Sequence, residues 1–378
     1  MRMKKFLILA ATVALSAACS HNYEVTPVVK DAGQIAFGSW ADNLTRAEAR
    51  VQGTNDWLAG DTFAVYGAKT DTDPDPDVTT TVFDDVVVTA SGSPVTWDYE
   101  NHRFWDLNCE SYTFYAISPS AVGTAATVTP ATGEITSASI TFAGNDNDIL
   151  VADKKVVLKG SEPYFNNFGT VPLTFNHIAS LFDLIVKKTN TITATVAVTA
   201  VSLTNMDATG TFSVSDAYNS TAYNGASGLA PVVTWNVPTP ATGTYTNASG
   251  VGGTVTLPTD VTGVATIDDS TKAAGDTLIR KLVIMPQTLR NDANVQTLNI
   301  TYTIQPTGGD LTTNTVAIPL YDFDISHDTA NDGTAVDTHK FLTGKHYTFY
   351  VTLDAHAIMF TATINDWTAQ PGYYYLMN

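Results

Sequence analysis

The fold is organised around the stretch GQIAFGSWADNLTRAEAR at residues 33–50. In its first part, 33–40, Ile35 and Phe37 fall on one face of an extended chain and small or polar residues fall on the other. Such period-two alternation is typical of a strand that is buried on one side. The sequence therefore predicts an amphipathic strand close to the amino end.

The connector that follows, 42–52, has a different character. It is mostly polar, contains neither Gly nor Pro, and carries Arg46 and Arg50, two of the six arginines in the sequence. An apolar strand that is joined to the body by an exposed, arginine-bearing connector can be cut off by an arginine-specific protease. We interpret 33–40 as a removable strand. The alternative is a strand followed by an ordinary surface loop.

Composition favours a folded all-β protein. The chain has 378 residues, of which 44% are hydrophobic, so it is long enough for two domains and a sizeable core. It is rich in Thr, Val, Ala, Gly, Asn and Asp, with 16 Tyr and 16 Phe, a mixture that suits short strands joined by turns. The formal charge of −18 argues against nucleic acid as a partner, because 19 Lys and Arg cannot form a dominant basic face.

The amino end has the features of an export signal. A positive segment at 2–5 precedes the largely apolar residues 6–15, which are too few to span a bilayer. Small residues stand directly before Cys19, which resembles a bacterial lipoprotein signal in which Cys19 is lipidated and becomes the first mature residue. The position three before the cysteine is Ser16 instead of the usual Leu. Ordinary cleavage after Ala18 would leave the same start without the lipid.

Few residues offer chemistry. Cys109 lies in an aromatic run and is interpreted as a small buried hydrophobe, and His177 as a hydrogen-bonded structural imidazole. The acidic runs 71–77 and 144–149 are interpreted as solvated turns, the second with a greater chance of a weak ion site. The sequence has no HExxH, GxSxG or phosphate-loop motif, and no paired Cys/His ligands. We therefore expect no enzyme and propose no cofactor or metal.

The carboxyl end carries the two clearest period-two runs. In the first, 345–354, aromatic and aliphatic residues alternate with polar ones. The second run alternates from Ile358 to Asn365, and Trp367 and Tyr373–Tyr375 extend its apolar character almost to the final residue. Its alternating apolar residues are Ile358, Phe360, Ala362 and Ile364. The two runs predict a final hairpin. A terminus that ends in an apolar strand and an aromatic tail needs a docking site or a partner.

Together these motifs resemble the fimbrillin family, the subunits of the type V pili of Bacteroidetes. The matching features are Cys19 in its signal, Ile35-Ala-Phe37 before Leu44-Thr-Arg46-Ala47, Trp57 with Gly60-Asp61 and Phe63, Leu173-Thr-Phe175-Asn-His177, Leu282-Val-Ile-Met-Pro286-Gln287, Gly344-Lys-His-Tyr347 and Ile364-Asn-Asp-Trp367. Their order and spacing cover most of the chain.

The resemblance implies two β-sandwich-like domains with Greek-key, transthyretin-like arrangements of mostly antiparallel strands. The expected division is a signal peptide at 1–18, a lipidated propeptide with the removable strand at 19–46, an amino-terminal domain at 47–170 and a carboxyl-terminal domain at 171–378. It also implies an outer-membrane lipoprotein precursor that an arginine-specific protease cuts after Arg46, leaving Ala47 first, with Arg50 as the second candidate.

Loss of the first strand would leave a groove, which the carboxyl-terminal strand of another copy or of a related subunit would fill. A sheet that lacks a strand exposes unpaired N–H and C=O groups beside an apolar trough, and such an edge accepts extended segments of suitable pattern. The candidate donor is 356–378, with Ile358, Phe360, Ala362 and Ile364 as its apolar side chains. The alternative function is a surface lipoprotein, a tip or an anchor subunit, that binds a glycan or host ligand.

Overall fold

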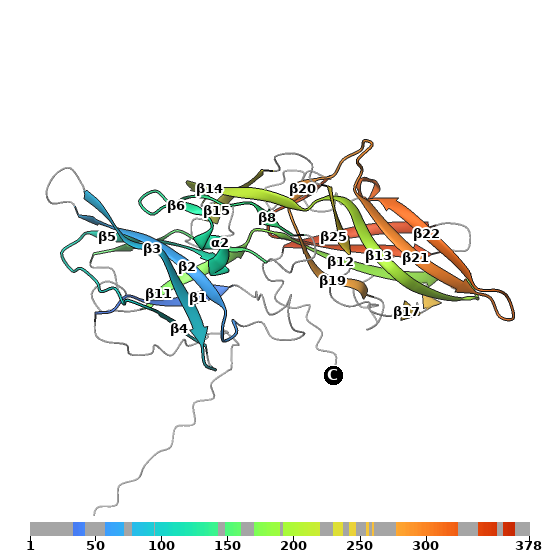
Figure 1. Cartoon of the computed structure of the whole chain (residues 1–378), viewed down its shortest axis with the longest axis horizontal. Coiled ribbons are helices and arrows are strands. Elements are labelled where there is room, and N and C mark those ends of the chain that lie inside the picture. Colours follow the sequence, from blue (N-terminus) through green and yellow to red (C-terminus); the bar gives the residue numbers. More distant parts are fainter. Residues whose placement is uncertain are drawn as a thin grey trace, which may run out of the picture.

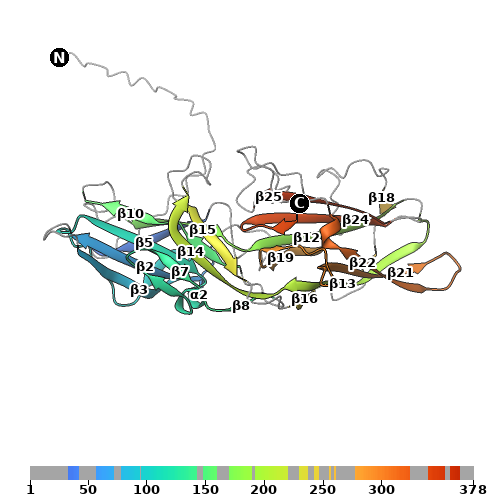
Figure 2. The same ribbon diagram turned by 90° about the horizontal axis from the view of Figure 1, so that it is seen from above.

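The computed structural model describes residues 33–41, 57–71, 78–93, 95–142, 148–159, 170–189, 192–219, 230–236, 242–246, 255–256, 259–260, 277–323, 339–353 and 358–366. Strands dominate these residues. The helical elements among them are one turn of α-helix, α2 (Ser120–Thr124), and one 3-10 turn, η2 (Leu320–Asp322). The prediction of an all-β protein is confirmed. Figures 1 and 2 show an elongated molecule with β-sheets at both ends.

The largest sheet has eight strands and occupies one end of the molecule (Figure 1). Its strands are β1 (Ala36–Ala41), β2 (Thr62–Asp71), β3 (Val78–Ser91), β4 (Thr96–Tyr99), β5 (Ser111–Ser118), β9 (Leu150–Ala152), β10 (Lys155–Leu158) and β11 (Thr170–His177). They follow the order β1-β11-β9-β5-β2-β3-β4, with β10 also beside β5. All pairs are antiparallel except β1 with β11, which is parallel.

The described remainder of the chain forms three five-stranded sheets and a two-stranded ribbon. One sheet holds β12 (Ser180–Thr189), β18 (Thr259–Asp260), β19 (Thr277–Ile284), β24 (Lys345–Leu353) and β25 (Ile358–Asp366). The second holds β13 (Thr195–Asp207), β16 (Thr242–Thr246), β17 (Val255–Thr256), β21 (Thr297–Gln305) and β22 (Thr312–Pro319). The third holds β6 (Thr127–Thr129), β7 (Glu134–Thr136), β8 (Ile140–Thr141), β14 (Thr209–Asn219) and β15 (Ala230–Asn236), and the ribbon pairs β20 (Gln287–Thr288) with β23 (Lys340–Phe341).

Two hydrophobic cores lie on opposite faces of the eight-stranded sheet. The first, which we call the front core, is enclosed by β1, β2, β3, β4, β5 and β11 and is rich in aromatic residues. The second, the main core, begins on the other face of β2 and β5 and continues between the sheets of β12 and β13. Strand β5 contributes Phe114 to the front core and Tyr115 to the main core. Strand β5 is therefore covered on both faces.

Strands β11 and β12 join the two ends of the molecule almost without a break. His177 ends β11, and its Nδ1 lies 2.8 Å from Oδ1 of Asp148 with both side chains fully buried. The prediction of a hydrogen-bonded structural imidazole is confirmed, and its partner comes from the acidic run 144–149. Because β11 belongs to the eight-stranded sheet, that sheet extends beyond residue 170. The domain boundary after residue 170 stays a prediction.

The predicted final hairpin is also confirmed. Strand β25 pairs antiparallel with β24, from Leu353 opposite Ile358 to Lys345 opposite Asp366. On its other side β24 pairs in parallel with β12. Strand β25 is therefore the outer strand of its sheet, with β24 as its one neighbour among the described residues.

Candidate functional site: the place of strand β1

Strand β1 is the structural centre of the site. It lies at the end of the eight-stranded sheet, where Ala36 to Ala41 pair with Thr170 to Phe175 of β11. Ile35 is fully buried and Phe37 is 4% exposed, and both belong to the front core. The predicted alternation of this strand is therefore present in the structure.

A second set of contacts holds the residues just before β1. The backbone N–H of Ile35 donates to the carbonyl of Arg103 at 2.8 Å, and that of Trp105 donates to the carbonyl of Gly33 at 2.9 Å. Gln34 forms an antiparallel bridge with Phe104 between these two bonds. We call residues 99–105 the clip. Residues 33–35 thus pair with the clip, and residues 36–41 pair with β11. The amino-terminal segment closes the front core between these two elements.

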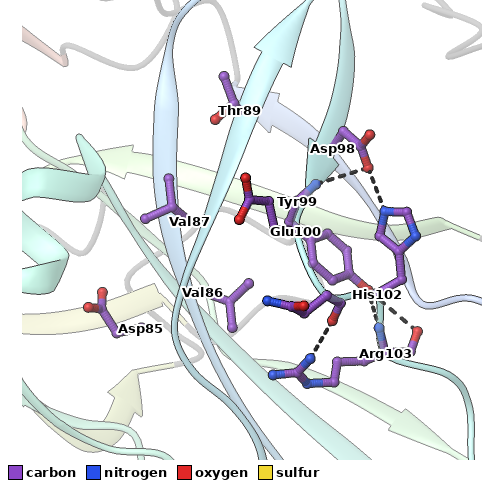
Figure 3. A pocket seen from close by; sticks show the side chains of 10 residues that line it. Asp85, Val86, Val87, Thr89, Asp98, Tyr99, Glu100, His102 and Arg103 are labelled. Carbon is purple, nitrogen blue, oxygen red and sulfur yellow. Dashed lines mark hydrogen bonds and ion pairs between the residues drawn. The ribbon is translucent and has the colours of Figure 1, made fainter.

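Tyr99 fixes the clip against Ile35. Its hydroxyl donates to the carbonyl of Ile35 at 2.6 Å and accepts from the backbone N–H of Arg103 at 3.1 Å. The Arg103 guanidinium in turn donates to the carbonyl of Val82 on β3 at 3.3 Å, and it also bonds the carbonyl of Asn101. Figure 3 shows the Tyr99 ring and the Arg103 side chain on this segment. Burial raises the pKa of Tyr99, so its hydroxyl stays protonated at neutral pH.

Phe37 occupies a cage of aromatic rings. Its ring centroid lies 5.2 Å from that of Phe83, 5.7 Å from that of Phe114 and 5.8 Å from that of Tyr99, at angles of 78°, 81° and 55°. Such edge-on and tilted arrangements are favourable for aromatic pairs. Without Phe37 the three rings would face an opening in the core that one large apolar side chain fills.

The two ends of the arginine-bearing connector lie beside the same residue. Ala41, the last residue of β1, pairs with Phe175 of β11. Trp57, the first described residue after the connector, packs against the Phe175 ring with the centroids 5.4 Å apart. The last described residue before the connector and the first one after it therefore lie close to each other. A cut between these two residues would separate β1 from the body without breaking any described strand.

The surface beside the clip offers a hollow (Figure 3). Two of the carboxylates that line it, Asp85 and Asp98, have partners within the fold. Asp85 accepts from the hydroxyls of Tyr66 and Thr124, and Asp98 lies 3.1 Å from Nε2 of His102. The tryptophans that could form a glycan platform are largely internal, with Trp97 at 8% and Trp105 at 7% exposure. These contacts give the residues structural roles.

Comparison with known proteins decides the family. Residues 45–367 match the model of the fimbrillin-like family. The chain belongs to the fimbrillin-like family. Comparison with curated proteins gave no match.

The fold of this fimbrillin-like protein is shared with a fimbrial protein from Bacteroides vulgatus, with 17% identity, a TM-score of 0.54 and coverage of 89% of this chain and 100% of that one. A protein from Bacteroides uniformis assigned to cell adhesion is 15% identical, with a TM-score of 0.45 and coverage of 89% and 98%. The tip fimbrial protein Mfa3 from Porphyromonas gingivalis, truncated at its carboxyl terminus, is 9% identical, with a TM-score of 0.33 and coverage of 82% and 95%.

Several predicted site residues of the fimbrillin-like chain lie outside the described residues. These are Cys19, Arg46, Ala47 and Arg50. The four apolar positions of the candidate donor lie in β25, where Ile358, Phe360, Ala362 and Ile364 pair with Leu353, Val351, Phe349 and Tyr347 of β24. Residues 367–378 of the candidate donor are outside the described part.

Sequence reasoning did not find the acceptor side of the site. The β11 segment, the clip and the cage rings Phe83 and Phe114 come from strands that the sequence predicts, but no local pattern says that they meet β1. None of the helices in the described ranges has the length and apolar character needed to cross a bilayer. Within those ranges no group of three His, Cys, Asp or Glu side chains is arranged to hold a metal ion.

Proposed function

We propose that this protein is a structural pilin that polymerises into cell-surface fimbriae by donor-strand exchange. Membership of the fimbrillin-like family supports a pilus subunit, and the fimbrial neighbour of the same fold agrees with it. One observation carries the finer proposal. The amino-terminal strand fills the front core through Ile35 and Phe37, and the connector that follows it in the sequence carries Arg46 and Arg50.

Removal of β1 would create an acceptor groove. The groove would have the β11 edge on one side, the clip on the other and the aromatic cage at its floor. Refilling the places of Ile35 and Phe37 with two similar side chains would contribute ~3–6 kcal/mol before ordering costs. Insertion of a strand from another copy is heterologous and does not close on itself, so it yields fibres.

The order of events in this proposal begins at the membrane. The precursor is exported, lipidated at Cys19 and held at the outer membrane. An arginine-specific protease then cuts after Arg46, or after Arg50, and the mature subunit begins at Ala47. The strand 33–41 leaves, and the carboxyl-terminal segment of a neighbouring subunit takes its place. Adhesion is supported by the resulting fimbrium.

The test uses the non-lipidated precursor, residues 20–378. It should stay monomeric until limited cleavage after Arg46 and then form high-mass polymers in size-exclusion chromatography. Arg46→Lys with Arg50→Lys is the matched control, because it keeps both charges and removes both sites. Deletion of 356–378 should also stop polymerisation. Polymers from the uncut control variant, or stable monomers after complete cleavage and loss of β1, would contradict the proposal.

The terminal residue of the protein recovered from cells separates this function from the alternative. Ala47 at the amino end supports a stalk subunit. A lipidated Cys19 supports an anchor, a tip subunit or a ligand-binding surface lipoprotein. Edman sequencing or mass spectrometry of the surface fraction reads this directly.

A further inference from the structure

The removable strand and the candidate donor share a sequence pattern. β1 and the residue before it read Ile35-Ala-Phe37-Gly-Ser39, and β25 begins Ile358-Met-Phe360-Thr-Ala362. In both segments an Ile is followed two residues later by a Phe, and two residues after that by a small residue. In β1 the Ile and Phe are the two front-core side chains. The donor candidate therefore carries the apolar pair that the acceptor groove would lose.

The same pattern occurs once more in the sequence, at Ile140-Thr-Phe142-Ala-Gly144. That segment lies inside the chain and is built into the main core, where Phe142 is fully buried and its N–H donates to the carbonyl of Ala208. It cannot leave without opening that core. The other two copies stand at the first and last described strands, where one can be replaced by the other.

The acceptor groove also offers backbone partners along most of the donor. In its own sheet β25 pairs with β24 through nine residues. The place of β1 offers six pairings with β11, for 36–41, and one bridge to the clip, at Gln34. A strand that moves from one place to the other exchanges one ladder for a shorter one. Burial of its Ile and Phe in the front core, and not backbone pairing, must therefore drive the move.

We infer that β25 of one subunit replaces β1 of the next side chain for side chain, in the same direction and register. This inference rests on the proposed function. In the polymer Ile358 takes the place of Ile35, Phe360 enters the cage of Phe37, and Ala362 takes the place of Ser39. The donor strand then runs parallel to β11.

Registers shifted by two residues fit less well. Moving the donor forward puts Ala362 in the aromatic cage, and moving it back puts Phe360 at the place of Ser39, whose hydroxyl is buried. The inferred register has one tight point. Thr361 would stand where Gly38 stands, and a Cβ there lies 3.0 Å from Cγ2 of Thr170. The Thr170 side chain must turn away for the donor to seat.

Disulfide trapping tests this register. In β1, Trp40 pairs with Thr174 of β11, so the inferred register puts Thr363 opposite Thr174. The test protein is residues 20–378 with Cys109→Ala, carrying Thr174→Cys and Thr363→Cys. Two matched controls combine Thr174→Cys with Thr361→Cys, which reports a shift of two residues, or with Ala357→Cys, which reports an antiparallel donor. Each protein is cleaved, assembled, oxidised and run on a heated non-reducing gel.

The expected result is a reducible ladder from the Thr363 pair that exceeds the ladders of both controls by about ten-fold. A register that is favoured over its alternatives by ~1.4 kcal/mol gives this ratio of populations. A second pair, Thr170→Cys with Met359→Cys, is used if a Thr174 variant does not assemble, because the same register places these residues opposite each other. Polymers that cross-link through the Thr361 or Ala357 variant instead, or through none of the pairs, overturn the register and leave the proposed function standing. Failure of the parent protein to polymerise after complete cleavage overturns both.

Discussion

The strands at the two ends of the described chain, β1 and β25, are held in opposite ways. Strand β25 pairs antiparallel with β24, the strand directly before it in the sequence. Strand β1 pairs in parallel with β11, which begins at Thr170, and the residues just before it form backbone hydrogen bonds with the clip. Chain connectivity keeps β25 beside its partner, since a short loop costs little closure entropy. Contacts alone would keep β1 in place once its connector is cut.

The two strands also differ in what they cover. Strand β1 closes a compact aromatic core, with Ile35 and Phe37 buried inside it. Strand β25 lies on the outside of a sheet whose core strands β12 and β24 are already paired with each other. This difference suits a molecule in which the first strand is replaced and the last strand is available to replace it.

The largest effect is expected from truncating the side chain that fills the cage. Phe37→Ala should lower the free energy of unfolding of the front core by ~3–5 kcal/mol, because it leaves a cavity among three aromatic rings. Urea denaturation of the uncut precursor measures it. Phe104→Ala is the control: Phe104 bridges the same segment but is 56% exposed, so its loss should cost less than ~0.5 kcal/mol. Equal costs would show that β1 contributes through its backbone alone.

A smaller effect is expected at the clip. Tyr99→Phe removes the hydroxyl that bonds both the Ile35 carbonyl and the Arg103 N–H, and it should weaken the hold on β1 by ~1–3 kcal/mol. After cleavage at Arg46 the fragment that contains β1 should dissociate faster, which fluorescence of a label on the fragment can follow. Glu100→Gln changes an exposed side chain of the same segment and should leave the rate unchanged. If both variants behave alike, the Tyr99 hydroxyl has no special role.

Amide exchange compares the two strands without a substitution. In the uncut precursor the amides of β24, which has a neighbour on each side, should exchange more slowly than those of β25, which has one described neighbour. Cleavage at Arg46 should accelerate exchange in β1 and in residues 170–175 of β11, and should leave β24 unchanged. Mass spectrometry of peptides from each strand reads the result. Acceleration confined to β25 would reverse the assignment of the strand that leaves.

The smallest effect concerns the ion pair next to the clip. The hydrogen bond from Lys69 lowers the pKa of Asp106 and raises the pKa of Lys69. Because the pair is partly exposed, Asp106→Asn should cost no more than ~1 kcal/mol at neutral pH. A carboxylate whose pKa is lower in the folded protein contributes stability at pH values above its pKa in the unfolded chain, roughly 4. That contribution is lost as the pH falls through the pKa of the folded state. The difference between variant and parent in urea melts should therefore disappear in acid, and a difference that persists there would assign the cost to packing.

Local patterns in the sequence predicted much of the strand structure. The alternation in 345–354 and from Ile358 onward predicted the β24–β25 hairpin. The interpretation of Cys109 as a small buried side chain is confirmed, and burial raises the pKa of its thiol. These features depend on residues within one strand or one hairpin, where side-chain period and short loops decide the outcome.

Other features had no local signal. The segment 121–140 reads as a polar stretch with a turn, yet β6 pairs with β7, and β7 and β8 pair with β14 far along the chain. Asp148 lies in a run that resembles a solvated turn, yet it is buried against His177. Both depend on partners supplied by distant segments, so neither could be derived from its own neighbours.

By itself the sequence determined that the chain is all-β, that 33–40 would be a strand with Ile35 and Phe37 inward, and that the chain would end in an apolar hairpin. Only the tertiary structure decided that β1 runs parallel to β11, that Tyr99 and Arg103 hold its first residues, and that three rings surround Phe37. Side-chain period is a property of consecutive residues. The choice of neighbours in a sheet is made by burial and backbone pairing between segments more than a hundred residues apart, and it is settled only when the whole core assembles.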